Sequence, residues 1–483
     1  GSVALPDSVP QIDMRGRYLA PGFWDMHVHL AYIGSEHVTA PVMVANGVLY
    51  ARDLSSDCVK SECAAKRNIK EMRALQASID GDEILAPHLV GLASFAVDGP
   101  RVAGERGRPQ EPSYLGPATA PEGMKLAAYF DERDVDFIKV YNTLPRNAFF
   151  GLMAEARRRN LEVVGHLPKS VSLSGALEAG LRSVEHAREL PLACSTIAEG
   201  YREEYSQWSP LSAEEYVAKK EASPNGDDAI NLPKRYREII NTQDADLCDN
   251  IITSWAAMES YYVPTHLTRE AEFLIADRPY ETDPRRAYVN DLVLNISWEP
   301  SAKSYETFFA ENEDGRASYV DFHELGLDLT GRAHAAGVKI LVGTDVGDIL
   351  IYPGFSFHDE MDRLSQAGLS NADILRAATL TAAEFEGLSA THGSIATGKQ
   401  ASFVFLADNP LADIAHTQSI VGVFHQGHYY DRDALDEVLA TASSKTSGLS
   451  FYATMGWDLA TRALPRQLWG DGGADGIGHH HVH

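Results

Sequence analysis

The sequence is short of cysteine, of basic residues and of long apolar runs, and each shortage excludes a class of protein. Four cysteines in 483 residues are too few for a disulfide scaffold. The formal net charge is −26, from 42 basic and 68 acidic residues, which argues against nucleic acid or an anionic membrane as a partner. No apolar stretch approaches the ~20 residues that span a bilayer. A hydrophobic content of 44% is instead typical of a soluble globular protein with a large core.

The cysteines leave the redox compartment open. Cys58 and Cys63 are close enough in sequence to form a disulfide, which suits an oxidising compartment, while free buried thiols explain them equally well. The chain begins abruptly at Gly1, which is compatible with a cloning remnant after removal of a leader peptide. We therefore favour an exported or periplasmic location slightly over a cytoplasmic one. The Gly-rich tail that ends in HHHVH is predicted to be a flexible end or a tag remnant.

Strand-like and helix-like segments alternate along most of the chain. Most of the predicted strands are followed by a helical pattern, and they cover residues 18–30, 46–54, 87–95, 135–141, 161–166, 181–186, 261–266 and 338–345. Alternating strands and helices predict a parallel sheet, and eight strands are the number that closes a barrel. The pattern therefore predicts an α/β fold, with a (β/α)8 TIM barrel in residues 21–388.

Two charged, helix-like insertions interrupt this alternation, at about residues 195–258 and 270–325. They are interpreted as a lid or an oligomer contact, with plain surface elaboration as the alternative. A homo-oligomer is expected. Residues 389–432 contain short β-runs joined by turns and are predicted to form a separate small β unit. Residues 433–483 are predicted to be helical at first and loose afterwards.

One segment resembles a phosphate-binding loop but does not fulfil its requirements. Gly393 to Lys399 matches G-x-x-x-x-G-K, but the next residue is Gln400 rather than Ser or Thr. The hydroxyl that would bind Mg²⁺ is therefore absent, and no strand–loop–helix pattern surrounds the segment. We exclude a nucleotide site here.

A more informative pattern is the pair His27 and His29 in the stretch YLAPGFWDMHVHL. In a strand, residues two apart point to the same face, so both imidazoles can reach one metal ion. Met26 and Val28 then point the other way, into packing. The pair alone is not specific, because two histidines on an exposed edge strand would have the same spacing.

Further polar residues stand at the carboxyl ends of other predicted strands, namely Lys139, His166, His186 and Asp345. Barrel enzymes place their chemistry at this end of the strands. Four imidazoles and a carboxylate suit zinc, manganese, iron or cobalt. No cysteine accompanies them, so a structural zinc–thiolate site is not indicated.

Lys139 is the unusual member of this set. It shares one face of its predicted strand with Phe137 and Tyr141, and so points into the barrel with the histidines. Burial disfavours a charged ammonium, and a neutral amine beside two cations can take up CO2 to form a carbamate. The alternative is an ion pair with a carboxylate such as Asp345, without a metal role. Spacing alone does not separate the two.

Together these motifs make the chain resemble the amidohydrolase superfamily, with prolidase-like (Xaa-Pro dipeptidase) and ochratoxinase-like members. The resemblance rests on PGFWDMHVHL, FIKVY, VVGHLP, SVEHA, VGTDVG, FHDEMDRLSQAGLSNADILRAATLTAA and GSIATGKQASFVFLADNPL, and covers nearly the whole chain. It implies a (β/α)8 barrel with a small β-sandwich built from both chain ends, here residues 1–20 and 389–432. The chain departs from the pattern in its short N-terminal segment and in Ser402, where the family usually has Asp.

The resemblance also implies a binuclear metal site. One divalent metal, with zinc expected, would be bound by His27, His29 and Asp345, and a second by His166 and His186. Carboxylated Lys139 and a water-derived hydroxide would bridge the two. The binuclear subtype is favoured over the deaminases because Lys169 stands three positions after His166, where deaminases carry Glu.

The predicted function is therefore hydrolysis of an amide or peptide C–N bond in a small-molecule substrate, such as a dipeptide or an N-acyl amino acid. Asp345 would take a proton from the attacking hydroxide and pass it to the leaving nitrogen. Tyr141 and His266 are candidates to bind substrate and donate to the developing oxyanion, with packing as the alternative role. A lactonase or phosphotriesterase using the same site is the alternative function, followed by a non-catalytic scaffold.

Overall fold

The computed structural model describes residues 11–32, 34–59, 66–100, 115–209, 228–312 and 314–448, with residues 211, 215, 218, 452, 453 and 456. Predictions for residues 1–10, for Cys63 and for the HHHVH end lie outside the described residues. No helix within the described ranges is long and apolar enough to cross a membrane.

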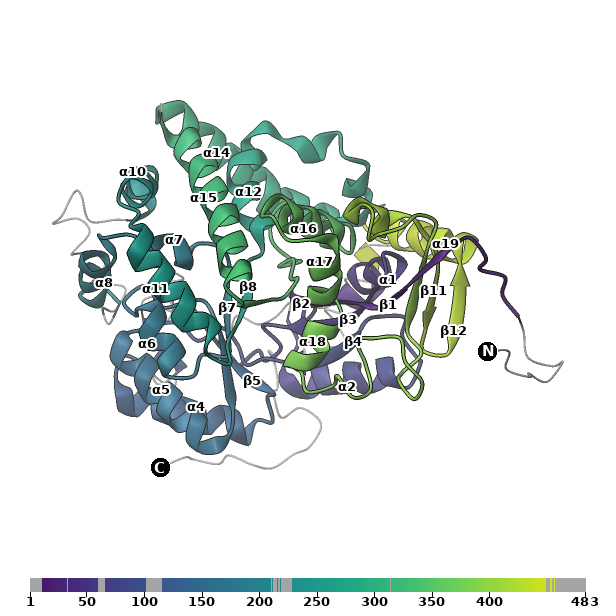
Figure 1. Ribbon diagram of the computed structural model, residues 1–483, viewed down its shortest axis with the longest axis horizontal. Coiled ribbons are helices and arrows are strands. Elements are labelled where there is room, and N and C mark those ends of the chain that lie inside the picture. Colours follow the sequence, from purple (N-terminus) through teal and green to yellow (C-terminus); the bar gives the residue numbers. More distant parts are fainter. Residues whose placement is uncertain are drawn as a thin grey trace.

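Eight parallel strands follow one another in chain order (Figure 1). They form two sheets of order β2-β3-β4 and β5-β6-β7-β8-β9, in which all neighbours are parallel. The bounds are β2 Phe23–Val28, β3 Val48–Asp53, β4 His88–Leu92, β5 Phe137–Val140, β6 Glu162–Gly165, β7 Ser183–Glu185, β8 Tyr261–Val263 and β9 Lys339–Ile340.

Backbone hydrogen bonds link the two sheets at both edges. Beyond β4, Ser94 N donates to Phe137 O at 2.9 Å. Beyond β9, Met26 N donates to Val342 O at 2.9 Å, and Val28 pairs in parallel with Val346. The predicted α/β fold of TIM-barrel type is therefore confirmed.

Burial explains why the strands read as nearly continuous apolar runs. Every residue of β2 (FWDMHV) and β3 (VLYARD) is buried, as expected for parallel strands covered on both faces. The helices that alternate with the strands are α1 Thr39–Ala45, α2 Ile69–Asp80, α4 Ala120–Glu132, α5 Arg146–Arg159, α6 Leu173–Glu178 and α7 Glu189–Ala193. Asp25 of β2 and Arg52 of β3 are charged exceptions that belong to the site described below.

Side-chain caps set the starts of two helices. Asn68 accepts from Glu71 N, and the Glu71 side chain accepts from Asn68 N, so that α2 begins at Ile69. Thr119 and Glu122 form the same capping box, so that α4 begins at Ala120. The caps satisfy backbone N–H groups that helical periodicity alone does not locate.

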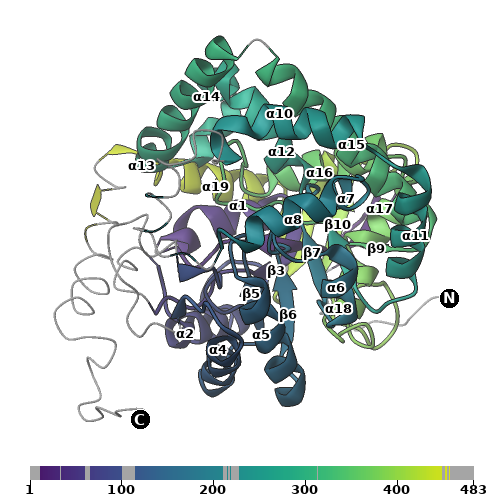
Figure 2. The ribbon, with the colours of Figure 1, turned by 90° about the vertical axis from the view of Figure 1, so that its left-hand side faces the viewer.

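The two insertions follow the carboxyl ends of β7 and β8. In Figure 2, α10, α12, α14 and α15 lie above the strands. Aromatic and aliphatic side chains of α7, α8, α10, α12 and α15 form a second hydrophobic cluster, with Leu192, Tyr236, Phe273 and Phe322 among its members. The bounds are α8 Ala198–Ser206, α10 Asp228–Asn241, α11 Ala245–Ala256, α12 His266–Leu274, α13 Asp291–Val293, α14 Glu299–Glu311 and α15 Gly315–Ala335.

A disulfide between Cys194 and Cys248 links the start of the first insertion to its helix α11. Beside it, Thr196 N donates to Thr242 O at 2.9 Å, and Asp244 N donates to Cys194 O at 2.9 Å. This bond was not expected from the sequence, because its cysteines are 54 positions apart. Cys58 is also disulfide-bonded.

A four-stranded antiparallel sheet joins the two ends of the chain (Figure 1). Its order is β1-β10-β11-β12, with bounds Tyr18–Pro21, Phe403–Leu406, Ile420–His425 and His428–Asp431. The predicted small β unit thus takes a strand from each of the two predicted segments. Its description as a β-sandwich, and the division of the chain into domains, stay predictions.

The helical pattern NADILRAATLTAAEFEG predicts one helix over residues 371–387, but the structure has two there. The chain forms α17 (Asn371–Ala377) and α18 (Leu380–Phe385), because Ala378 O accepts from Trp24 N of β2 instead of continuing a helix. Helices α16 (Phe355–Gln366) and α19 (Arg432–Ser443) complete the described α-helices. In the loop before β10, Lys399 Nζ donates to Ser389 O at 2.6 Å and to His392 O at 3.1 Å, so this lysine holds the loop together.

Candidate metal centre and active site

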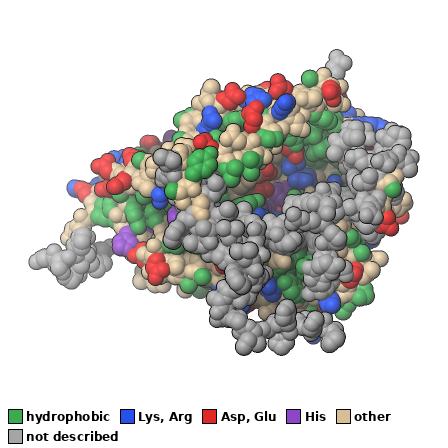
Figure 3. Space-filling view, turned by 180° about the vertical axis from the view of Figure 1, so that it is seen from behind, with side chains coloured by type: hydrophobic (Ala, Val, Ile, Leu, Met, Phe, Trp, Pro, Cys, Tyr) green, Lys and Arg blue, Asp and Glu red, His purple; other side chains and the backbone are tan. Residues whose placement is uncertain are grey.

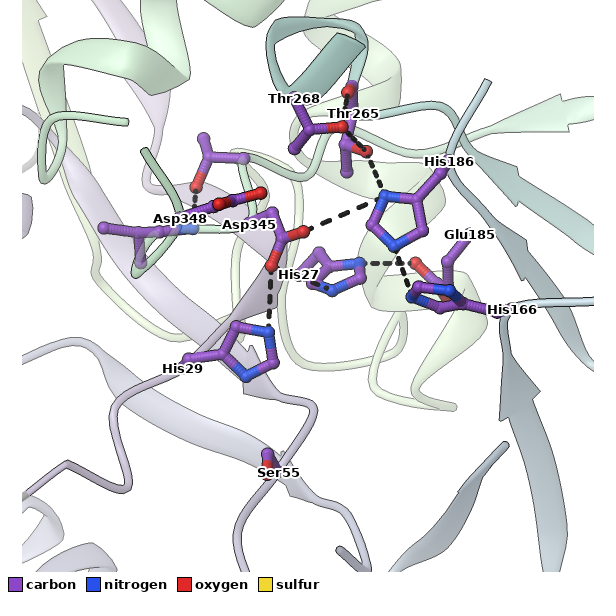
Figure 4. A network of polar contacts seen from close by, with 12 residues as sticks. His27, His29, Ser55, His166, Glu185, His186, Thr265, Thr268, Asp345 and Asp348 are labelled. Carbon is purple, nitrogen blue, oxygen red and sulfur yellow. Dashed lines mark hydrogen bonds and ion pairs between the residues drawn. The ribbon is translucent and has the colours of Figure 1, made fainter. Parts of the chain in front are cut away.

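Four histidines and an aspartate meet at the carboxyl ends of the strands (Figure 4). His27 and His29 come from β2 and the residue after it, His166 follows β6, His186 follows β7, and Asp345 lies beyond β9. Parallel strands in a barrel direct their carboxyl ends to one side, which is why these distant residues converge.

Asp345 lies at the centre of this group. Its Oδ1 atom is 2.9 Å from His29 Nε2 and 3.3 Å from His27 Nε2, and its Oδ2 atom is 3.8 Å from His186 Nδ1. Ligand atoms of His27, His186 and Asp345 lie within 4.8 Å of one another. Burial raises the pKa of Asp345, but the neighbouring His27 and His29 outweigh it and hold the pKa below its usual range.

His166 and His186 face each other with their Nε2 atoms 2.7 Å apart. Their Nδ1 atoms are occupied: that of His166 lies 2.8 Å from Asn142 Oδ1, and that of His186 lies 2.7 Å from Thr265 Oγ1. Because Asn142 Oδ1 can only accept, His166 Nδ1 donates and its neutral ring leaves a lone pair on Nε2. Burial lowers the pKa of both histidines well below the usual value, which keeps the rings neutral and suits them to hold a cation.

Lys139 is buried beside this group, on β5. Its Nζ atom has no hydrogen-bond partner among the described residues, and no ion pair joins it to Asp345. Burial is the main cause that lowers its pKa to about 8. Its aliphatic chain passes Gly165 so closely that a Cβ there would lie 3.0 Å from Lys139 Cδ. An unpaired buried amine fits a group whose partner is absent from the protein itself.

Sequence reasoning missed the carboxylate that orients His27. His27 Nδ1 donates to Glu185 Oε2 at 2.9 Å, and Arg52 Nη2 donates to Glu185 Oε1 at 2.8 Å. Burial raises the pKa of Glu185, but the charge of Arg52 and the contact with His27 outweigh it and lower the pKa to about 2. Arg52 Nε also donates to Met26 O at 2.7 Å. The available signal was the presence of Arg52 and Glu185 inside otherwise apolar strands, which requires buried partners.

A second missed residue, Asp25, ties β2 to the segment that carries Asp345. Thr344 Oγ1 donates to Asp25 Oδ2 at 2.6 Å, and Thr344 N donates to Asp25 Oδ1 at 3.0 Å. Burial raises the pKa of Asp25 to about 7. Asp345 itself has a φ of 64°, and its N donates to His27 O at 2.8 Å. Asp25 therefore helps to hold a bend that turns Asp345 toward the histidines.

The two predicted substrate residues differ in their placement. The ring centroid of Tyr141 lies 4.1 Å from that of His166, so Tyr141 is next to the candidate metal centre. His266 begins α12, and its buried ring lies 5.9 Å from His323, without a hydrogen-bond partner for either ring nitrogen among the described residues. Strand β8 ends at Val263 rather than at His266, and Thr265 makes the contact with His186 instead. The geometry thus gives His266 no contact with the metal-site residues, and its substrate role stays a prediction.

Comparisons with known proteins agree with this geometry. Residues 326–429, which include Asp345, match the amidohydrolase family. The predicted amidohydrolase resemblance is confirmed. No curated protein sequence matches this chain.

Several solved structures share the fold of this chain. Bottromycin amidohydrolase is 20% identical, with a TM-score of 0.63 over 92% of this chain and 83% of that chain. A Xaa-Pro dipeptidase with bound methionine is 17% identical, with a TM-score of 0.57 over 89% and 91%. A prolidase complexed with N-methylphosphonate-L-proline is 18% identical, with a TM-score of 0.55 over 89% and 91%. These likenesses establish the fold, while the roles of the individual residues stay predictions.

Proposed function

We propose that this protein is a metal-dependent hydrolase that cleaves the C–N bond of an amide or peptide in a small substrate. The observation that carries the proposal is the convergence of four imidazoles and Asp345, with the buried Lys139 close enough for its charge to act on His27 and His166. The amidohydrolase segment and the fold shared with an amidohydrolase and a dipeptidase support the same chemistry.

The residues present fit two divalent metals. His27, His29 and Asp345 would hold one, His166 and His186 the other, and Lys139 as a carbamate would supply the bridging anion. The Nε2 atoms of His166 and His186 lie 2.7 Å apart, so both rings direct a nitrogen to the same point and could hold one cation there. We expect zinc, which takes imidazole and carboxylate ligands. When bound, such metals lower the pKa of a water molecule and polarise a carbonyl group.

The remaining steps fall to the side chains of this chain. Glu185 holds His27 in one tautomer and one orientation, so that Nε2 faces the site. Asp345 lies at the centre of the cluster, where Oδ2 can take a proton from an attacking water and return it to the leaving nitrogen. The Tyr141 hydroxyl would donate to the developing oxyanion.

Three further features belong to the proposal. The hydrogen bonds at both edges of the two sheets support a closed (β/α)8 barrel, and the four-stranded sheet is interpreted as the core of a small β-sandwich. The disulfide-bonded cysteines favour an oxidising compartment, as in exported or periplasmic proteins. A homo-oligomer is still expected.

The test combines metal content with a substrate screen. Protein produced with added zinc and bicarbonate is measured for metal per chain, then assayed with dipeptides, N-acyl amino acids, lactones and phosphotriesters. About two metals per chain with amide hydrolysis is the expected result. Turnover of only lactones or phosphotriesters would favour the alternative esterase-type function. Absence of metal after reconstitution would favour a scaffold instead.

A further inference from the structure

Arg188 lies in the loop between β7 and α7, two residues after His186. Its side chain is half-buried, and its Nε atom is shielded from solvent without a hydrogen-bond partner. Across the ranges that the structure describes, Arg188 makes neither a hydrogen bond nor an ion pair. A guanidinium that loses water without gaining a partner is unfavourable, so this position is suited to a ligand that supplies the partner.

The other shielded arginines of the described residues all have partners. Examples are Arg52 with Glu185 at 2.8 Å and Arg269 with Glu272 at 2.6 Å. Acidic residues outnumber basic ones by 68 to 42, so carboxylates are plentiful in this chain. The lack of an internal partner for Arg188 is therefore a local feature of the site rather than a shortage of acidic groups.

The charge of Arg188 acts on the residues around the metal centre. Burial raises the pKa of Tyr141, and the charge of Arg188 opposes this rise. Burial also raises the pKa of Tyr236 on α10, and there the charges of Arg269 and Arg188 both oppose the rise. The guanidinium is thus near enough to both Tyr141 and Tyr236 for its charge to act on them. Figure 3 shows a hollow on one face of the molecule in which histidine and Lys or Arg side chains are visible.

We propose that Arg188 binds a carboxylate group of the substrate, so that the enzyme prefers amides that carry a free carboxylate over neutral amides. This inference rests on the proposed amide hydrolysis. The planar guanidinium matches a carboxylate with two parallel hydrogen bonds, which gives orientation as well as affinity. Arg269 is less suited to this role because Glu272 already neutralises it. The substrate class is N-acyl amino acids and peptides with a free C-terminus.

The experiment uses the zinc-loaded enzyme and a set of N-acetyl-L-amino acids, each paired with its C-terminal amide. Release of the amine product gives kcat/KM for both members of each pair, in the wild type and in Arg188→Gln. Arg157→Gln is the matched control, because Arg157 is exposed in the last turn of α5. Metal content is measured for all three proteins.

We expect the wild type to prefer the carboxylate member of the pairs. Arg188→Gln should lower kcat/KM for that member by about 10- to 100-fold, as for a lost hydrogen bond between charged groups, and leave the amide member within about twofold. Arg157→Gln should resemble the wild type. An equal loss on both members would overturn the inference, because Arg188 would then support the site as a whole.

Two other outcomes separate this inference from the proposed function. If the wild type hydrolyses only the neutral amides, the carboxylate site is wrong and amide hydrolysis stands. If no amide is hydrolysed by protein that holds metal, the proposed function fails, and titration calorimetry with the N-acetyl-amino acids decides the inference. Binding that Arg188→Gln weakens at least tenfold supports it, and binding that is absent or unchanged overturns it.

Discussion

The Nδ1 atom of His27 donates to Glu185 Oε2 at 2.9 Å, across 158 positions of the sequence. This contact decides which nitrogen of His27 faces the site, because the proton on Nδ1 leaves the lone pair on Nε2. Burial is the main cause that lowers the pKa of His27 to about 4, so the ring is neutral near pH 7. Arg52 balances the charge of Glu185, and the three side chains form one buried unit.

Glu185→Gln should weaken metal binding about 10- to 100-fold, which is usual for loss of a carboxylate behind a ligating histidine. The substitution also leaves Arg52 buried without an anionic partner, so the unfolding temperature should fall. Metal titration and thermal unfolding measure the two effects. Glu178→Gln is the control, since Glu178 is exposed on α6. Unchanged metal affinity would show that Glu185 stabilises the buried core and does not orient His27 for metal binding.

Lys139→Ala should abolish hydrolysis and remove the second metal, because the bridging anion would be lost. Added short carboxylic acids such as acetate or propionate should restore part of the activity by occupying the space of the side chain. Metal analysis and kinetic assays with and without these acids provide the measurement. A fully active variant would contradict the carbamate bridge. Lys70→Ala, on the exposed face of α2, should behave as the wild type.

His358 should make the protein less stable in acid. Its Nε2 donates to Asn46 O at 3.0 Å, and its Nδ1 lies 2.9 Å from Thr417 Oγ1. Burial lowers the pKa of His358 to about 4, so between pH 6.5 and 4 the unfolded chain binds a proton that the folded chain does not. The contribution of the neutral His358 ring to the free energy of unfolding is present above pH 6.5 and is lost as the pH falls toward 4. From pH 7 to pH 5 it amounts to about 2 kcal/mol.

Denaturant unfolding at pH 7 and pH 5 tests this dependence on His358. The variant His358→Gln should be less stable at pH 7, but its further loss at pH 5 should be smaller than that of the wild type by about 2 kcal/mol. The control Gln366→Asn should keep the wild-type pH dependence, because it changes no titratable group and Gln366 is exposed at the end of α16. Equal pH dependence in the wild type and His358→Gln would refute the assignment.

Replacing Cys194 and Cys248 together by alanine should lower stability by about 2 to 4 kcal/mol, because the bond closes a long loop of the unfolded chain. The segments that the disulfide links should then become accessible to limited proteolysis, and the substrate range should change. Metal content should stay at the wild-type level. Unfolding, proteolysis and metal analysis give the three readouts. Loss of metal in this variant would show that the insertion helps to form the metal centre.

Much of the fold could be predicted because it depends on local patterns. Apolar runs followed by helical periodicity located the strands that end near His166 and His186, and the spacing of His27 and His29 placed both on one side. Boundaries were less accurate where a distant group competes for the backbone. Trp24 N donates to the carbonyl of Ala378, and the predicted helix is divided there. Strand β8 ends at Val263, so His266 does not lie at the end of the strand.

The sequence by itself determined the alternation of elements and the set of chemically suitable side chains, because both depend on residue type and on spacing along the chain. Only the tertiary structure decided which partners these side chains have. Glu185 meets Arg52 across 133 positions, and Cys194 meets Cys248 across 54. Arg188 has no hydrogen-bond or ion-pair partner among the described residues. Such contacts depend on how strands and insertions come together in space, and no local sequence pattern predicts that arrangement.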